Sequence, residues 1–186
     1  MTQSQLIQHI SAVDESFIGI GIGNEPKQEG FTLQELVDLT FYADKTIAVK
    51  ASRVLETMLV KFPENYCDEI EYFIKCAEQV DFPGCAKHYA KIIAHITSPE
   101  VPKEVRNKVK EINFERIIEL CFGWMKDAEM LVSVRASSSE ALFNLRHRYP
   151  WIAEDLSRQL ELIMPTAEPL LLAKGNLILS YLHCED

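Results

Sequence analysis

Three side chains that could bind a metal ion fall on one predicted helix near the middle of the chain. Cys85, His88 and His95 stand at positions i, i+3 and i+10, so they share a broad helical face. A tetrahedral zinc site needs four ligands and draws them from tighter, paired spacings. The sequence supplies neither a fourth ligand nor paired spacings, so we predict no metal and no cofactor. We interpret both histidines as residues of a polar helix face.

Two other short motifs could carry catalytic chemistry. Gly19, Gly21 and Gly23 lack the offset third glycine of a dinucleotide-binding loop and the strand and helix that flank it. The serine run 137–139 offers hydroxyl nucleophiles, but it has no sharp-turn motif and no assignable His/Asp partner. We therefore predict a loop at the glycines, close helix packing at the serines and no catalytic residue.

Each of the two tryptophans has an acidic residue about one helical turn away. Trp124 precedes Asp127, and Trp151 precedes Asp155. A DNA glycosylase would use such a pair to stack a base and to stabilise a cationic sugar. Both tryptophans lie on or at the ends of the acidic helices described below, so core packing or a hydrophobic staple is the preferred interpretation.

A small residue followed by a basic one recurs four times along the chain. The pairs are Val49-Lys50, Ala86-Lys87, Val134-Arg135 and Ala173-Lys174. Their basic members are 37, 48 and 39 residues apart, and each pair opens an apolar helical stretch. A motif that recurs about every 40 residues, each time at the start of a helix, is typical of stacked two-helix repeats. The sequence therefore predicts an all-α fold.

The apolar periodicity predicts eight repeat helices, at 31–43, 47–62, 64–79, 84–97, 111–126, 131–149, 151–163 and 168–183. Pro63 and Pro150 suit a first helical turn, where a missing N–H group costs nothing. Residues 36–41 match 117–122 at an offset of 81, and Lys61-Phe62-Pro63 matches Arg148-Tyr149-Pro150 at 87. These offsets indicate duplication of a block of two units.

We divide the chain into four parts within one structural domain. Residues 1–30 form an N-terminal capping helix and a glycine-containing loop, because the ends of a repeat array need atypical caps. Residues 31–97 and 114–186 are the two helical blocks of two units each. Residues 98–113 contain two prolines and a charged run, which predicts an inserted turn or short helix between the blocks.

Segment 126–142 closely resembles a HEAT repeat. It runs from Lys-Asp-Ala-Glu through Val-Arg-Ala to Glu-Ala-Leu, and HEAT units likewise place an aspartate in the turn and a Val-Arg pair before an alanine-rich helix. Asp44 before Val49-Lys50 resembles a second copy, and Asp81 before Ala86-Lys87 a third. The fourth, 165–174, lacks the turn aspartate. The likeness covers about 31–183.

The resemblance implies a right-handed α-α superhelix, an armadillo-type solenoid of about four helix pairs with an N-terminal cap. HEAT-like families are mostly scaffolds and adaptors, which implies protein binding. One enzymatic branch, the alkylpurine DNA glycosylases, uses the same fold with tryptophan and aspartate in a basic cleft. The chain also resembles short bacterial proteins that carry an adenylosuccinate lyase name. It is too short for the lyase fold, however, and lacks the serine-rich catalytic loop with Met-Pro-Lys-Asn.

Charge separates between the two sets of predicted helices. The second helices of the units hold nine basic and three acidic residues, and the first helices hold thirteen acidic and four basic ones. In HEAT-like solenoids the second helices line the concave face, so the resemblance implies a basic groove on an acidic body. The candidate groove residues are Lys50, Arg53, Lys87, Lys91, Arg135, Arg146, His147 and Lys174. The alternative is a structural ladder in which Lys50, Lys87 and Arg135 pair with the turn aspartates.

Our predicted function is a non-catalytic interaction module that binds an acidic protein partner in this groove. The alternative is that the chain is itself a HEAT-like nucleic-acid-binding protein or an alkylpurine DNA glycosylase, with nucleic acid as its partner. It is disfavoured because the acidic helices repel a long polyanion and no stacking aromatics alternate with the basic residues.

The amino-acid composition indicates the class of protein and the cellular compartment that we expect. The 186 residues carry a net charge of −9, with 47% hydrophobic and 25% charged residues, an ordinary globular mixture. The five cysteines, Cys67, Cys76, Cys85, Cys121 and Cys184, form no disulfide framework and indicate reduced thiols. The start of the sequence lacks a signal-peptide core, and no apolar run approaches the ~20 residues of a membrane helix. We expect a cytoplasmic protein without a membrane partner.

Overall fold

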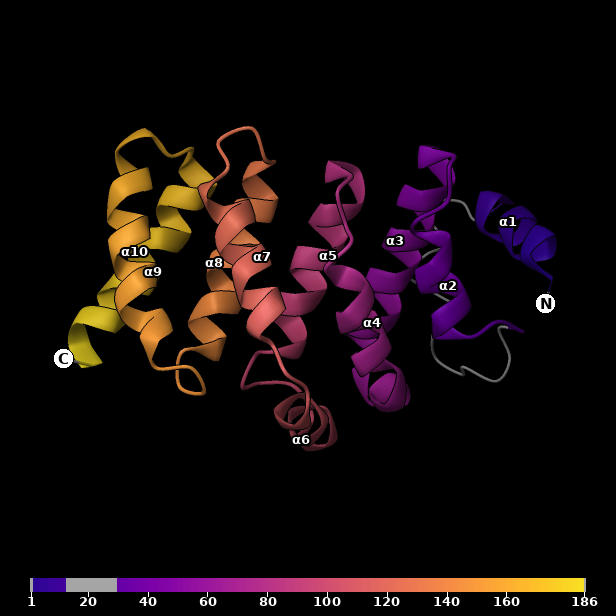
Figure 1. The fold of residues 1–186 in the computed structure, drawn as a ribbon, viewed down its shortest axis with the longest axis horizontal. Helices are drawn as coiled ribbons and strands as arrows, with labels where there is room; N and C mark the ends of the chain where they lie inside the picture. The colour runs from indigo at the N-terminus through magenta and orange to yellow at the C-terminus, as the bar shows by residue number, and fades with distance from the viewer. Residues whose placement is uncertain (1, 13–29, 186) are drawn as a thin grey trace.

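The computed structural model describes residues 2–12 and 30–185 (Figure 1). Within these residues the regular structure is entirely helical, with no strand, so the all-α prediction is confirmed. The predicted glycine loop at 19–23 lies outside the described residues. Across the described ranges, every helix is too short or too polar to cross a membrane.

Ten α-helices and two 3-10 helices make up the described part of the chain. In chain order they are α1 (Gln3–Ala12), α2 (Leu33–Leu39), α3 (Lys45–Lys61), η1 (Pro63–Glu69), α4 (Ile70–Ala77), α5 (Pro83–Ile96), α6 (Lys103–Glu111), α7 (Glu115–Lys126), α8 (Val132–Leu145), α9 (Trp151–Ile163), η2 (Met164–Thr166) and α10 (Pro169–Glu185).

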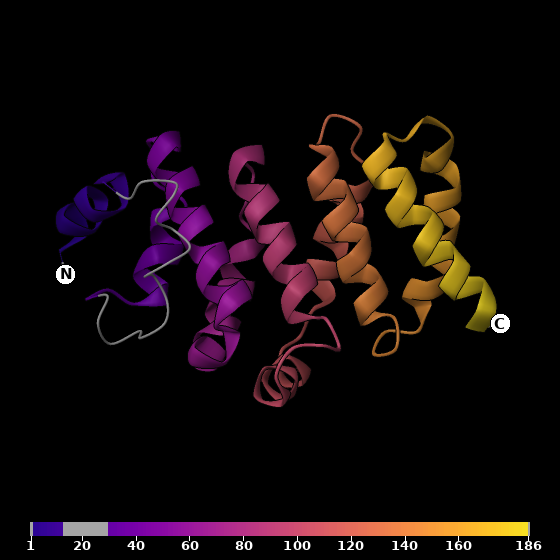
Figure 2. The same ribbon diagram turned by 180° about the vertical axis from the view of Figure 1, so that it is seen from behind.

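The helices form two rows. The long-helix row consists of α3, α5, α8 and α10, in which each helix packs against the next (Figure 2). The short-helix row consists of α2, α4, α7 and α9 and lies on the opposite side (Figure 1). Three short-row helices pack on the long-row helix that follows them: α2 on α3, α7 on α8 and α9 on α10. The helix α6 stands outside both rows against η1, α4 and α5.

Local sequence explains where several of these helices begin. Thr32 and Glu35 form a capping box at α2, in which each side chain accepts a hydrogen bond from the other residue's backbone N–H. Asp44 caps α3 by accepting from the N–H of Thr46 at 2.9 Å. Pro83 occupies the first turn of α5, where its missing N–H leaves no bond unmade.

The predicted helix at 64–79 is wrong in its first half. Pro63 begins the 3-10 helix η1, and the α-helix α4 starts only at Ile70. Tyr66 has non-helical dihedral angles (φ −125°, ψ 19°) and is buried, which breaks the α-helical hydrogen-bond ladder at that point. The helix predicted at 151–163, by contrast, coincides with α9.

One apolar core runs through both rows, and α5 lies at its centre. The ring of Tyr89 on α5 stacks on Phe73 of α4 at a centroid distance of 4.9 Å. Its hydroxyl shares a hydrogen bond of 2.8 Å with Thr40, at the end of α2. On the other side of α5, Asn144 of α8 donates to the Ala94 carbonyl at 2.9 Å. The two halves of the chain are therefore joined through α5 and α8.

Leucine truncations in α8 and α9 should separate core packing from surface effects. Leu142 is fully buried in α8, so Leu142→Ala should lower the free energy of unfolding by about 2–5 kcal/mol through lost burial and the cavity it leaves. Leu162 of α9 is 69% exposed, so the same substitution there should cost less than about 0.5 kcal/mol. Urea denaturation measures both; equal losses would contradict the assignment of α8 to the core.

Candidate functional site

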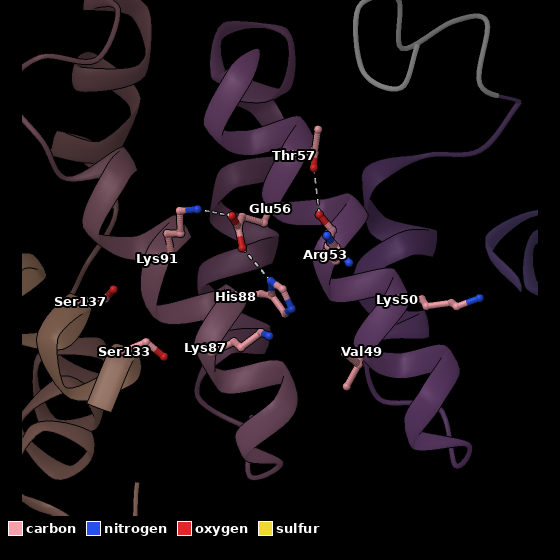
Figure 3. A pocket seen from close by; sticks show the side chains of 10 residues that line it. All are labelled: Val49, Lys50, Arg53, Glu56, Thr57, Lys87, His88, Lys91, Ser133 and Ser137. Atoms are coloured by element: carbon pink, nitrogen blue, oxygen red, sulfur yellow. Dashed lines mark hydrogen bonds and ion pairs between the residues drawn. The ribbon is translucent and has the colours of Figure 1, made fainter. Parts of the chain in front are cut away.

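A hollow of about 570 Å³ opens on the long-helix row between α3, α5 and α8 (Figure 3). The charged and histidine side chains in its wall are Lys50, Arg53, Glu56, Lys87, His88 and Lys91. From α8, Ser133 and Ser137 add two hydroxyl groups. Counted over the described part of the chain, the wall thus holds four basic side chains and one carboxylate.

Helical periodicity directs these side chains to the hollow. On α3, Lys50 and Arg53 are three residues apart and Glu56 follows one turn later, so all three share a face. On α5, Lys87 and Lys91 are four residues apart, with His88 beside them. The other faces of both helices are apolar and buried in the core, which prevents the polar faces from turning away.

The carboxylate of Glu56 joins α3 to α5. Its Oε2 lies 2.6 Å from Nδ1 of His88, and its Oε1 accepts from Nζ of Lys91 at 2.5 Å (Figure 3). The Glu56 side chain is only 19% exposed. Burial by itself raises the pKa of this carboxyl, but the hydrogen bonds and positive charges of His88 and Lys91 outweigh it and hold the pKa below its ordinary value.

The imidazole of His88 is buried, with 5% of the residue exposed, and only one side of the ring is satisfied. Nδ1 faces Glu56, whereas Nε2 is buried without a hydrogen-bond partner among the residues that the structure describes. Figure 3 shows Nε2 directed away from Glu56, toward the side of the hollow where Val49, Lys50 and Lys87 lie. A buried polar atom without a partner costs about 1–3 kcal/mol, so this nitrogen is an unmet binding group in the wall.

Two lysines at the mouth of the hollow form no ion pair with a described carboxylate. Lys50 donates to the carbonyl of Ser11 at 2.9 Å, which ties the end of α1 to α3 and uses one of its three donors. Lys87 is exposed and makes no hydrogen bond or ion pair within residues 2–12 and 30–185. Neither lysine is neutralised by a carboxylate in the described ranges.

The other predicted groove residues lie elsewhere. Arg135 is buried, donates to the Met125 carbonyl at 3.1 Å and pairs with Glu168 at 3.3 Å. Lys174 pairs with Glu140 at 2.8 Å. Both cations therefore hold helices together and are offset by carboxylates.

Arg146 and His147 line a second hollow of about 510 Å³ between α5, α6, α8 and α10. The guanidinium carbon of Arg146 lies 3.7 Å from the centroid of the Phe143 ring, a cation–π geometry. The structure thus brings four of the eight predicted groove residues together in one hollow, and these two in another.

The alternative ladder of basic residues and turn aspartates does not form in the described part of the chain. Asp44 and Asp127 instead accept hydrogen bonds from nearby backbone N–H groups, those of Thr46 and Glu129, each at 2.9 Å. The aspartate side chain is short, so it accepts hydrogen bonds from backbone N–H groups of its own turn and does not extend to a cation on the following helix.

Several of the remaining sequence candidates make contacts with residues far away in the sequence. The Cys85 thiol donates to the Thr40 carbonyl at 3.6 Å, and His88 is engaged with Glu56. Among the described residues no three His, Cys, Asp or Glu side chains converge as metal ligands. Trp124 is buried, whereas Trp151 is 50% exposed and stacks on Phe122 with centroids 6.0 Å apart.

From the sequence we considered His88 only as a metal ligand or a residue of a polar helix face, and we did not predict its pairing with Glu56; the structure buries the His88 side chain against that carboxylate. The two residues are 32 positions apart and on different helices, so no helical spacing relates them. Comparison with protein-family models, with curated proteins and with solved structures finds no match to this chain.

The Glu56 pair should contribute stability that depends on pH. Because the pKa of Glu56 is lowered in the folded protein, its contribution is present above the unfolded pKa and is lost as the pH falls through the folded pKa. Glu56→Gln should therefore lower the free energy of unfolding at pH 7 by about 1–3 kcal/mol. The gap from wild type should close as the pH falls below about 4.

Urea denaturation between pH 7 and pH 3 measures this gap. Glu129→Gln is the matched control, because Glu129 is exposed and its carboxylate makes no ion pair within the described residues. It should track the wild type throughout. A Glu56→Gln gap that stays constant with pH would mean that shape, and not charge, accounts for the loss.

Proposed function

We propose that this protein is a non-catalytic, HEAT-like helical-repeat module that binds an acidic segment of another protein. The binding site is the hollow over α3 and α5. The observation that carries the proposal is the local charge: among the described residues, four basic side chains and one carboxylate line the hollow, on a chain whose net charge is −9. A positive hollow in an acidic body attracts a short negative segment and orients it.

The row structure supports the repeat assignment. Each long-row helix packs on the next, as stacked helix pairs require, and α2–α3, α7–α8 and α9–α10 pack as consecutive pairs. The four small–basic pairs of the sequence fall on α3, α5, α8 and α10 in turn. We infer a right-handed superhelix of HEAT type, with the long-helix row as its concave, partner-facing side.

The chemistry of the hollow supports a peptide over a nucleic acid. No aromatic side chain from residues 2–12 or 30–185 lines it, whereas proteins that hold single strands stack bases on aromatic rings between their basic residues. The tryptophans give a glycosylase little support, because Trp124 is buried and Asp127 is engaged with the backbone of its own turn.

Charge reversal at the mouth of the hollow tests the proposal. Lys87→Glu should weaken binding of a short peptide rich in Asp and Glu by about tenfold or more at low salt. Lys126→Glu at the end of α7 changes the net charge equally, and Lys126 is also exposed, so it should bind like wild type. Fluorescence anisotropy measures both, and affinity should fall toward physiological salt, where charges are screened over ~8 Å.

A single-stranded RNA serves as the competing probe in the same experiment. Equal loss of peptide binding in both variants, or no loss in either, would move the site away from this hollow. Tight RNA binding that Lys87→Glu removes, without peptide binding, would replace the acidic protein by nucleic acid as the partner.

A further inference from the structure

The unmet nitrogen of His88 restricts what the hollow can bind. Nε2 belongs to a ring that is more than nine-tenths buried, and it points away from Glu56 within the wall of the hollow, with Lys87 near the ring (Figure 3). The fold places a buried hydrogen-bonding atom here and provides no partner for it among the described residues. A ligand that reaches this atom gains a bond that the free protein lacks.

The hydrogen bond between His88 and Glu56 determines which ring nitrogen of His88 carries a proton. The Glu56 carboxylate can only accept hydrogen bonds, so Nδ1 must carry the proton on their shared bond. Nε2 then bears a lone pair when the ring is neutral and an N–H when it is an imidazolium. A ligand that matches both forms must be able to accept a hydrogen bond and also to donate one.

A phosphate monoester has this property near neutral pH. Its second pKa is about 6, so it exists both as a dianion and as a monoanion that retains one P–OH group. The dianion accepts from the imidazolium, and the monoanion donates to the neutral ring. Carboxylates, sulfate and phosphodiesters carry no proton at neutral pH and match only the imidazolium.

The surrounding charges suit the same ligand. Among the described residues, the charged groups that line the hollow with His88 come from two helices: Lys50, Arg53 and Glu56 from α3, and Lys87 and Lys91 from α5. From α8 the hollow receives hydroxyl groups only. Lys87 lies beside the His88 ring (Figure 3), and lysine ammonium groups bind phosphate oxygens as compact point charges.

We propose that this hollow is a subsite for a phosphate monoester, which the acidic partner carries as a phosphoserine or phosphothreonine. The inference rests on the proposed function, because it names the group that the acidic segment inserts. Nε2 has almost no exposed surface, so the phosphate must displace a neighbouring side chain. The long lysine stems at the mouth move at the least cost.

Three peptides rich in Asp and Glu test the proposal with the full chain. They are identical except for one central residue, which is phosphoserine, glutamate or serine. Isothermal titration calorimetry should show the phosphoserine peptide binding about tenfold tighter than the glutamate peptide. Inorganic phosphate should compete at concentrations at which sulfate does not.

Two substitutions of His88 isolate the role of Nε2. An asparagine amide nitrogen takes the position of Nδ1, so His88→Asn keeps a donor for Glu56 and removes Nε2. It should bind the phosphoserine and glutamate peptides equally. A glutamine amide takes the position of Nε2, so His88→Gln should retain part of the phosphoserine preference. Urea denaturation confirms that each variant folds; if His88→Asn does not, the contrast between phosphate and sulfate competition in the wild type still decides.

The outcomes separate the two proposals. Equal affinity for the phosphoserine and glutamate peptides, together with equal competition by phosphate and sulfate, would overturn the phosphate subsite and leave the acidic groove intact. Failure of all three peptides to bind would overturn both the proposed function and the phosphopeptide. RNA that competes as strongly as the phosphoserine peptide would also overturn the monoester, because RNA offers only diesters.

Discussion

The packing of α5 between α3 and α8 is the contact on which most of the structure depends. Residues on most sides of α5 are buried, including the Tyr89 ring that stacks on Phe73, and Asn144 of α8 bonds to its backbone. A helix held on so many sides has little freedom to rotate or slide, because close-packed side chains have few alternative arrangements. The polar face that remains, with His88 and Lys91, is therefore held against the polar face of α3.

The Glu56 carboxylate is the second constraint, because it joins α3 to α5. A carboxylate that is 19% exposed is costly unless it is paired, and α5 supplies both partners. The same bond that satisfies Nδ1 of His88 determines the direction of its ring, so Nε2 is held toward the hollow. One interaction thus joins two helices and leaves Nε2 of His88 buried without a partner among the described residues.

Charge is distributed in a way that the net value of −9 conceals. Along the long-helix row, Arg135 and Lys174 are offset by Glu168 and Glu140, so their fields are reduced in the C-terminal half. Among the described residues, the hollow over α3 and α5 is lined by four cations and one carboxylate, that of Glu56. Because screening limits the reach of such charges to about 8–10 Å in physiological salt, this favours a short anionic group over an extended polyanion.

Sequence patterns alone predicted the helical class and most of the helices of this protein. The prediction of 84–97 lies close to α5 (Pro83–Ile96), and that of 151–163 coincides with α9, because apolar periodicity and prolines at helix starts act within one helix. The break at Tyr66 was not predicted, since it depends on where that ring is buried. Only the tertiary structure paired Glu56 with His88 across 32 residues and Arg135 with Glu168 across 33. The spacing along one helix specifies which side chains share a face, whereas the packing of apolar side chains from many helices decides which faces meet.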